Sequence, residues 1–331
     1  MPFDTVAFAR ALINIASTTG QEAEAGAWLA GALRTLGYTV VEQPLAGGRA
    51  NVIATLDAPD VVLSTHYDCV PPFFPSRVEG DLLYGRGSCD AKGILAAQVA
   101  AAERIRQRGE RRLGLLFVAG EERGSDGAVA ANAFAPGSRF LINGEPTNSR
   151  LGSATRGVLR VRLIAQGRAA HSALPERGES AIDKLIDALV RLRSIALPAD
   201  PELGRTFYSV GLIDGGIAPN VISPHASAEL LFRTVGPPGD ILRILAGLEP
   251  LVSVQEVLSV PTVKLHTVVG IPTDVFPFTT DVPLLDRWGT PLLFGPGSIA
   301  VAHTAGEHVA IAELEAAIDT YERLAQECLA S

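Results

Sequence analysis

The stretch VVLSTHYD, residues 61–68, carries the pattern that decides the fold. Its first five residues form a run typical of a strand buried on both faces of a sheet. The run ends abruptly at His66, a potential metal ligand, and Asp68 follows two positions later. Because ligands of open α/β sheets bind beyond the carboxyl ends of the strands, this pattern predicts a functional site at the end of the strand.

Acids follow other segments of the N-terminal half in the same way. Those that come after YGRGSC, LGLLFVAG and RFLIN are Asp90, Glu121, Glu122 and Glu145. Gathering so many like charges in one crevice would be prohibitive without cations. A pair of divalent metal ions resolves the conflict, and histidine and carboxylate ligands suit zinc, cobalt or manganese.

Each of these residues also has a plainer interpretation when it is taken alone. His66 could be a hydrogen-bonded core histidine, and Glu121 with Glu122 could be a solvated loop pair. Asp90 could cap the helix that follows it, and Glu145 could belong to a turn. To explain all of these residues without a metal, a separate structural role is needed at each position. The occurrence of the whole set in this order therefore favours the metal site.

The length of 331 residues is sufficient for two domains, and the alternation of strands and helices predicts an α/β sheet in the first. The first is an α/β domain with a mixed, mostly parallel sheet and helices on both faces, which carries the predicted metal site and is built from residues 1–155 and 263–331. The sequence pattern changes near residue 155, where apolar and basic residues begin to alternate. We therefore expect an inserted α+β sandwich domain over residues 156–262.

Two patterns within the insert predict its local structure. In GVLRVRLIAQG, Leu159, Val161 and Leu163 alternate with Arg160 and Arg162, as in an antiparallel strand that is wet on one face. In SAIDKLIDALVRLRSI, four apolar residues recur at helical spacing and predict the buried stripe of an amphipathic helix: Ile182, Leu185, Ile186 and Leu189.

Composition excludes several classes of partner. With 28 basic and 36 acidic residues the net charge is −8, which argues against nucleic acid and against an anionic membrane surface. No window approaches the ~18 uncharged apolar residues of a membrane span, and the N-terminus predicts an amphipathic helix, not a signal peptide. Three cysteines without CxxC spacing favour a reducing cytosol, with Cys69 and Cys89 as small buried residues more than catalytic thiols.

Five sequence blocks together resemble the signature of the M20 metallopeptidase family. They are HYDCVP, YGRGSCDAKG, GEERGS, NGEPT and AHTAGEH, and they span most of the chain in this order. The family includes acetylornithine deacetylase, succinyl-diaminopimelate desuccinylase, acetyl-lysine deacetylase, aminoacylase and glutamate carboxypeptidases. The resemblance implies a zinc-peptidase-like catalytic domain and an inserted lid domain through which two copies form a homodimer.

The resemblance also implies roles for individual residues in a centre of two divalent ions, zinc or else cobalt or manganese. Asp90 would bridge the ions, with His66 and Glu145 completing one site. Glu122 and His303 would complete the other. Asp68 would hold the imidazole of His66 in the correct tautomer. Glu121 would be the general base that takes a proton from water and returns it to the leaving nitrogen.

The insert and the late region have candidates of their own. By resemblance, His171 would stabilise the oxyanion, from either its own or a partner subunit, while Asn220 and Arg233 would bind the substrate. Gly295 in FGPGS would let the backbone approach the substrate closely. The alternatives are a turn cap for His171, an outward-facing strand arginine for Arg233 and an ordinary tight turn for Gly295.

The late blocks bear on the substrate, which we expect to be a small N-acyl amino acid. TTDVPLL lacks the arginine typical of the desuccinylases, and GPGSIAVAH most resembles the acetylornithine and acetyl-lysine deacetylases. N-acetylornithine is therefore the first expectation, followed by N-acetylcitrulline, N-acetyl-lysine and succinyl-diaminopimelate. The open alternatives are a dipeptidase or carboxypeptidase, a non-catalytic binding protein of the same fold, and a thiol enzyme.

Overall fold

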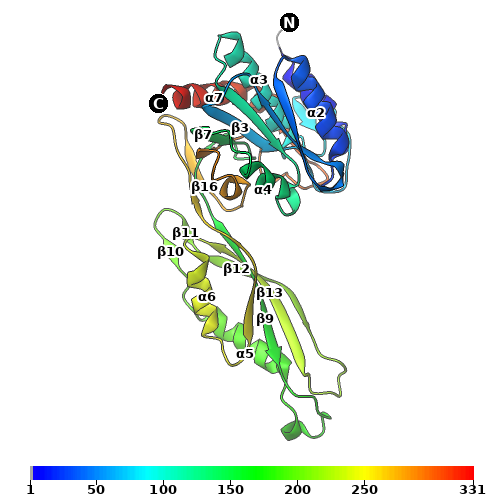
Figure 1. The fold of residues 1–331 in the computed structure, drawn as a ribbon. Helices are drawn as coiled ribbons and strands as arrows, with labels where there is room; N and C mark the ends of the chain where they lie inside the picture. Colours follow the sequence, from blue (N-terminus) through cyan, green and yellow to red (C-terminus); the bar gives the residue numbers. More distant parts are fainter. Residues whose placement is uncertain (1–2) are drawn as a thin grey trace. The chain divides into compact units, whose positions relative to one another are not determined.

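The computed structural model describes residues 3–331, which form two compact units (Figure 1). Unit 1 comprises the described residues up to Ser153 together with Leu265–Asp274 and Thr280–Ser331. Unit 2 comprises Ala154–Lys264 and Val275–Thr279. The predicted insert, 156–262, lies within unit 2, which also takes in the short later segment because Arg156 N donates to the carbonyl of Phe276 (2.9 Å).

Unit 1 is built on a six-stranded sheet in the order β1-β2-β6-β3-β7-β17. The strands β6, β3, β7 and β17 are parallel to one another, and β2 and β1 add an antiparallel edge beside β6. The bounds are β1 Thr39–Pro44, β2 Ala50–Thr55, β3 Val61–His66, β6 Leu113–Val118, β7 Phe140–Asn143 and β17 Thr290–Leu293. The predicted mixed, mostly parallel α/β sheet is confirmed.

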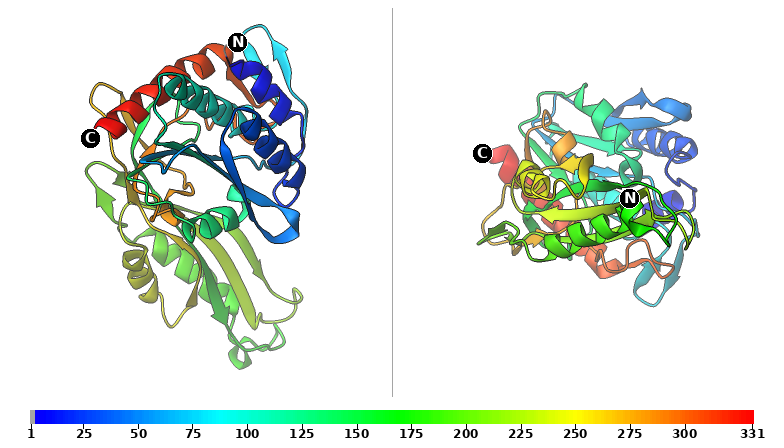
Figure 2. Two further views of the ribbon diagram at one scale, coloured as in Figure 1. Left: turned by 45° about the horizontal axis from the view of Figure 1, so that its top comes forward. Right: turned by 90° about the horizontal axis from the view of Figure 1, so that it is seen from below.

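Helices cover both faces of this sheet. Figure 2 (left) shows α2, α3 and the red α7 on one side of the strands and the green α4 on the other. The bounds of the helices are α1 Thr5–Ile13, α2 Ala23–Thr35, α3 Lys92–Gln107, α4 Asp126–Asn132 and α7 Ile311–Ala330. Within β3, Val61 and Leu63 belong to the core under α2, α3 and α7, whereas Val62 packs with Trp288 in the core under α4. This period of two explains why VVLST is apolar on both faces.

The described residues also form two small three-stranded sheets, of which β18-β5-β4 belongs to unit 1. A three-stranded sheet orders β18 (His308–Ala310), β5 (Leu82–Tyr84) and β4 (Arg77–Glu79), and another orders β15 (Val263–Lys264), β8 (Leu151–Thr155) and β16 (Thr273–Phe276). Single 3₁₀ turns occur at η1 Ala46–Gly48, η2 Glu121–Arg123 and η4 Val282–Leu284. No helix in the described range 3–331 is long and apolar enough to cross a membrane.

The order of the sheet brings three strand ends together. β3 lies between β6 and β7 and runs parallel to both, so their carboxyl ends open on the same edge. His66 is paired with Val118, the last residue of β6, and η2 with its two glutamates follows three residues later. Glu145 follows β7 by two residues. The topology therefore gathers His66 and Glu145, which are 79 positions apart in the sequence.

Unit 2 contains a four-stranded antiparallel sheet with two helices. Its order is β12-β13-β9-β14, which leaves β12 and β14 at the edges. The bounds are β9 Gly157–Gln166, β12 Phe207–Gly215, β13 His225–Thr234, β14 Ser253–Val260, α5 Ala181–Arg193 and α6 Pro238–Ala246, with a small hairpin of β10 Ala199–Asp200 and β11 Gly204–Arg205 and the turn η3 Pro175–Arg177. The alternation predicted for 157–167 is present, since the three aliphatic residues are buried and the two arginines are exposed.

The stripe predicted for α5 is only half correct. Leu185 is buried and Leu189 packs against the core, but Ile182 and Ile186 are exposed. The helix instead buries a narrower stripe of Ala181, Leu185, Ala188 and Leu192. Two alanines in this stripe let the helix sit close to the sheet, and the bulkier isoleucines are left on the outer surface of the unit.

Candidate metal centre

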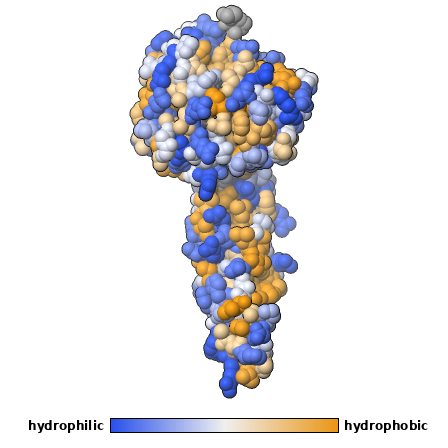
Figure 3. All heavy atoms as spheres, turned by 90° about the vertical axis from the view of Figure 1, so that its right-hand side faces the viewer, coloured by the Kyte–Doolittle hydropathy of each residue, from blue (hydrophilic) through white to orange (hydrophobic). Residues whose placement is uncertain are grey.

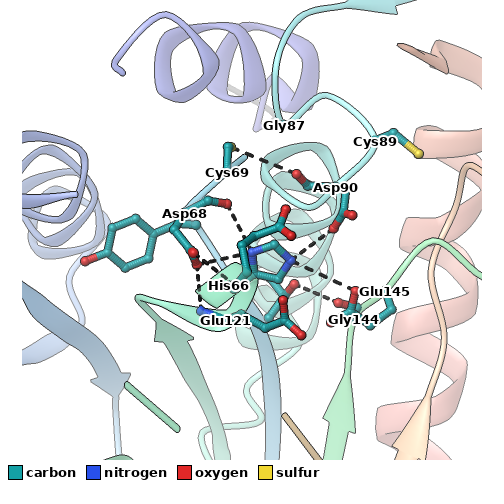
Figure 4. Close-up of polar contacts among 12 residues, drawn as sticks. His66, Asp68, Cys69, Gly87, Cys89, Asp90, Glu121, Gly144 and Glu145 are labelled. Carbon is teal, nitrogen blue, oxygen red and sulfur yellow. Dashed lines mark hydrogen bonds and ion pairs between the residues drawn. The ribbon is translucent and has the colours of Figure 1, made fainter. Parts of the chain in front are cut away.

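His66 ends β3 and is oriented by Asp68 (Figure 4). Its Nδ1 lies 3.1 Å from the carbonyl oxygen of Asp68 and 3.4 Å from Oδ1 of the same residue. Nε2 points the other way and lies 3.0 Å from Oδ1 of Asp90. Burial alone would lower the pKa of this imidazole, but Asp68 and Asp90 raise that pKa well above its usual value. A positive charge is therefore favoured where Nε2 meets Asp90.

Asp90 faces two imidazoles with its two oxygens. Oδ1 contacts Nε2 of His66 at 3.0 Å, and Oδ2 lies 3.2 Å from Nε2 of His303. Burial would raise the pKa of Asp90, yet the hydrogen bonds from the two histidines hold that pKa below its usual range. The helix-capping alternative is wrong, because the residue that caps α3 is Ala91 and no side chain accepts a hydrogen bond there. A carboxylate that presents each oxygen to a separate imidazole has the geometry of a bridging ligand.

Glu122 and His303 form the second half of the cluster. Nε2 of His303 lies 3.0 Å and 2.9 Å from the two carboxylate oxygens of Glu122. Hydrogen bonds that His303 donates to Asp90 and Glu122 raise its pKa to about 10. His303 has a positive φ of 63°, an unusual backbone conformation that directs its ring toward these acids. The two residues are 181 positions apart, and only the fold brings them into contact.

Glu145 completes the half of the cluster that contains His66. Its Oε2 lies 4.0 Å from Nε2 of His66, while Oε1 is buried without a hydrogen-bond partner among residues 3–331. Burial raises the pKa of Glu145 well above its usual value. Position 295 requires glycine for a steric reason that differs from the predicted one, because a Cβ there would lie 2.3 Å from the carbonyl oxygen of Glu145. The role of Gly295 in substrate binding stays a prediction.

Asp68 also fixes the loop that carries the two glutamates. Its carboxylate accepts hydrogen bonds from the backbone N–H groups of Glu121 (3.0 Å) and Glu122 (3.2 Å) and from the hydroxyl of Thr19 (2.7 Å). Burial would raise the pKa of Asp68, but His66, the Thr19 hydroxyl and the N–H of Glu121 lower it. The carboxylate that orients His66 thus places Glu121 and Glu122 beside it, a second function that the sequence did not reveal.

The same loop is anchored from the other side by Asn51. Its Oδ1 accepts the N–H of Ala119 (3.2 Å), and its Nδ2 donates to the carbonyl of Gly127 (2.8 Å). Arg49 forms an ion pair with Asp126 beside it. Nothing in the sequence around Asn51 indicates that this residue holds both ends of the segment 119–127.

Asp281 is a buried acid in the same region that sequence analysis passed over. It is 1 % exposed, and neither carboxylate oxygen has a hydrogen-bond partner within the described residues. Burial raises its pKa to about 6, and its charge in turn raises the pKa values of Glu121 and Glu145. TTDVPLL was noted only for the arginine that it lacks.

The donor set of this region fits divalent cations. Six carboxylates lie in or beside the site against two imidazoles: Asp68, Asp90, Glu121, Glu122, Glu145 and Asp281. One ligand atom each from His66, Asp90 and Glu122 lies within 4.8 Å of the others. Glu145 adds a buried oxygen without a partner. Such an excess of buried negative charge is stable only with bound protons or cations, and oxygen with imidazole nitrogen is a ligand set for zinc and related metals.

The remaining candidates belong to unit 2. His171 is exposed, and its Nδ1 accepts the N–H of Ala173 (3.1 Å), which is the turn-capping contact considered as an alternative and leaves Nε2 as a free donor. The exposed Asn220 lies beside it, since its carbonyl accepts the N–H of Ser172 (3.0 Å). Arg233 is half-buried on β13, no carboxylate pairs with it in the described structure, and burial lowers its pKa.

The three cysteines are free and buried, as expected. Burial raises the pKa of Cys69 to about 12 and raises that of Cys89 further. Reactive cysteines need a depressed pKa and access to solvent. The structure therefore argues against a thiol enzyme.

An α/β catalytic unit with a carboxylate and histidine cluster at the carboxyl edge of its sheet is the architecture of a metallopeptidase. Comparison with known proteins gives the family directly: the chain belongs to peptidase family M20/M25/M40, whose sequence model matches residues 62–327. It is thus a hydrolase that acts on amide bonds.

Individual relatives agree with this assignment. A protein of Aspergillus clavatus named "probable carboxypeptidase" is 35% identical over 98% of this chain and 82% of its own. The crystal structure of aminopeptidase PepT from Bacillus cereus superimposes with a TM-score of 0.80 at 19% identity, covering 98% of both chains. The YXEP protein of Bacillus subtilis, described as a dinuclear metal-binding M20 peptidase, has a TM-score of 0.76 at 16% identity over 97% of this chain and 96% of its own.

Proposed function

We propose that the protein is a metal-dependent hydrolase that cleaves the amide bond at the nitrogen of an amino acid with a free α-carboxylate. The observation that carries the proposal is the placement of Asp90, whose two oxygens face two different imidazoles in a cluster with an excess of carboxylates. This substrate class covers carboxypeptidases, dipeptidases and N-acyl amino acid deacylases, which differ only in the acyl part.

In this proposal His66 and Glu145 would hold one ion, Glu122 and His303 the other, and Asp90 would be shared. Bound divalent ions, zinc first and cobalt or manganese as alternatives, polarise a carbonyl and lower the pKa of water. Glu121 lies next to Glu122 with a pKa that burial raises well above its usual value. A carboxylate of that kind suits a base that accepts a proton from water and delivers it to the leaving nitrogen. Asp68 keeps the base in place through the N–H of Glu121.

Substrate recognition is assigned to three residues of unit 2. Arg233 has no carboxylate partner of its own in the described structure, and a guanidinium matches an α-carboxylate with two parallel hydrogen bonds. Asn220 and His171 lie beside each other, and Nε2 of His171 is free to donate to a developing oxyanion. We propose that these three groups bind the carboxylate and the scissile carbonyl, with His171 acting in its own or a partner subunit.

The names of the relatives favour a peptidase over a deacetylase, so release of a carboxyl-terminal amino acid from a short peptide is our first proposal. Deacylation of N-acetylornithine remains the second, because GPGSIAVAH most resembles acetylornithine and acetyl-lysine deacetylases. N-acetylcitrulline, N-acetyl-lysine and succinyl-diaminopimelate belong to the same test.

The test is a hydrolysis panel with dipeptides, tripeptides and these N-acyl amino acids, each paired with its carboxyl-terminal amide. We expect cleavage of the free acids and at least about 100-fold slower cleavage of the amides, since a site built for a carboxylate rejects its neutral analogue. Glu121→Gln serves as the inactive control for contaminating peptidases. Equal rates on acids and amides would refute the proposed substrate class, and an inactive, metal-free protein would support the non-catalytic alternative.

We also propose that unit 2 forms a homodimer. Its edge strand β12 exposes Phe207 (50 %), Leu212 (64 %) and Ile213 (66 %), and α5 exposes Ile186 and Val190. Figure 3 shows apolar side chains gathered along unit 2 on the face in view. A long apolar edge strand left open to solvent invites pairing with another strand. A second copy of the same strand is the partner that satisfies this edge.

A further inference from the structure

Glu307 is a fully buried carboxylate four residues beyond His303. Its Oε1 accepts hydrogen bonds from three backbone N–H groups of one loop, those of Gly87 (2.9 Å), Cys89 (3.2 Å) and Asp90 (3.1 Å). These N–H groups lie outside any strand or helix, so they need an acceptor from elsewhere in the chain. A single oxygen from the C-terminal segment supplies it.

The other oxygen of Glu307 extends the contact to a second loop. Oε2 pairs with the guanidinium of Arg86, whose side chain is also buried. Nε of Arg86 donates to the carbonyl of Pro72 (3.2 Å), and the guanidinium lies over the ring of Phe74 at 5.0 Å. Pro72 and Phe74 follow shortly after His66 and Asp68 in the sequence. Glu307 thus ties its own segment to the loops on either side of the site.

We propose that Glu307 is a positioning residue that sets Asp90 at the correct distance from His303. Both Glu307 and His303 belong to one short segment, and the contact of Glu307 with the N–H of Asp90 fixes where that segment lies against the Asp90 loop. The carboxylate touches no reacting atom and works through the backbone. The proposal rests on the metal centre described above, and it predicts that the site is preorganised for metal by an acid outside the ligand set.

Glu103 offers a matched control within the same unit. It is 3 % exposed and pairs with Arg106 through two hydrogen bonds of 2.8 Å and 2.7 Å. It lies on α3, and its partner Arg106 on the same helix is not a residue of the metal centre. Both acids are buried partners of an arginine, so a loss of general stability should affect Glu103→Gln and Glu307→Gln alike.

The experiment compares metal affinity of the metal-free full-length proteins by zinc competition with a chromophoric chelator. Glu307→Gln should bind zinc about 10–100-fold more weakly than wild type, as is typical when a group that orients a ligand is removed. Glu103→Gln should bind zinc as wild type does. Equal affinities of the Glu307 and Glu103 variants would overturn the inference. Absence of zinc binding in the wild type would instead refute the proposed metal centre.

A second variant covers the case in which Glu307→Gln does not fold. Glu307→Asp keeps the charge opposite Arg86 but shortens the reach toward the three N–H groups. Its zinc affinity and kcat should fall while KM stays near the wild-type value, because the substrate contacts are unchanged. Wild-type zinc affinity in Glu307→Asp would contradict the positioning role.

Discussion

Replacing Asp281 by asparagine should remove a pH-dependent cost from the stability of unit 1. Burial raises the pKa of Asp281 from 3.8 to about 6. Between these values the folded state binds more protons than the unfolded state, so the free energy of unfolding falls as pH rises. The free-energy cost of ionising the buried Asp281 is therefore absent below the unfolded-state pKa and complete above the folded-state pKa.

The magnitude follows from the size of the shift. A shift of about 2 pKa units at about 1.4 kcal/mol per unit gives a cost of about 3 kcal/mol at pH 8 and about half of that at pH 5. Asparagine does not titrate, so the fixed cost of burying its amide is the same at every pH. The stability of Asp281→Asn relative to wild type should therefore rise by about 1.4 kcal/mol from pH 5 to pH 8.

Urea unfolding of the metal-free protein, followed by tryptophan fluorescence, measures this difference. Both tryptophans, Trp28 and Trp288, belong to unit 1, so the signal reports on the unit that contains Asp281. Trp288 is 1 % exposed and packs near Leu285, a few residues from the substitution. Asp81→Asn, at an exposed acid of the same unit, is the control. A stability difference that stays constant between pH 5 and pH 8 would refute the reasoning.

Three further perturbations have defined outcomes. Glu121→Gln should retain both metal ions, measured by mass spectrometry, and lose at least about 100-fold in kcat, since it removes the proposed base; retained activity contradicts that role. Asp68→Ala should destabilise unit 1 by at least about 3 kcal/mol in urea unfolding, because it leaves the N–H groups of Glu121 and Glu122 and the Thr19 hydroxyl without an acceptor. A loss of stability below about 1 kcal/mol would contradict this prediction. Leu212→Glu on β12 should convert the proposed dimer to a monomer, measured as a halved mass in light scattering. The control Val269→Glu, at a 93 % exposed residue of unit 1, should leave the mass unchanged. An unchanged mass in both variants would place the dimer interface elsewhere.

Local sequence patterns were sufficient for the strands and for the polar residues at their ends. VVLST and LGLLFVAG predict buried strands, and the parallel neighbours β3, β6 and β7 then bring His66, Glu121 and Glu145 to one edge. The strand of 157–167 was likewise predictable, because its period of two is set by the sheet itself. These inferences need only the periodicity of each element and the rule that parallel strands end together.

Contacts between distant loops could not be predicted in this way. Asp281, Asn51 and Glu307 gain their importance from where the chain returns to the site, and no periodicity or spacing marks them. The prediction that Ile182 and Ile186 are buried in the core was wrong for a related reason. An apolar residue at helical spacing can face a partner outside the chain as well as the core. Tertiary and quaternary packing decides such cases.

The central claim is that Asp90 is shared between two divalent ions. Anomalous diffraction at the zinc absorption edge, on crystals of the protein loaded with zinc, tests it most directly. Two peaks should flank Asp90, one beside His66 and Glu145 and the other beside Glu122 and His303. A single peak, or peaks away from Asp90, would contradict the account.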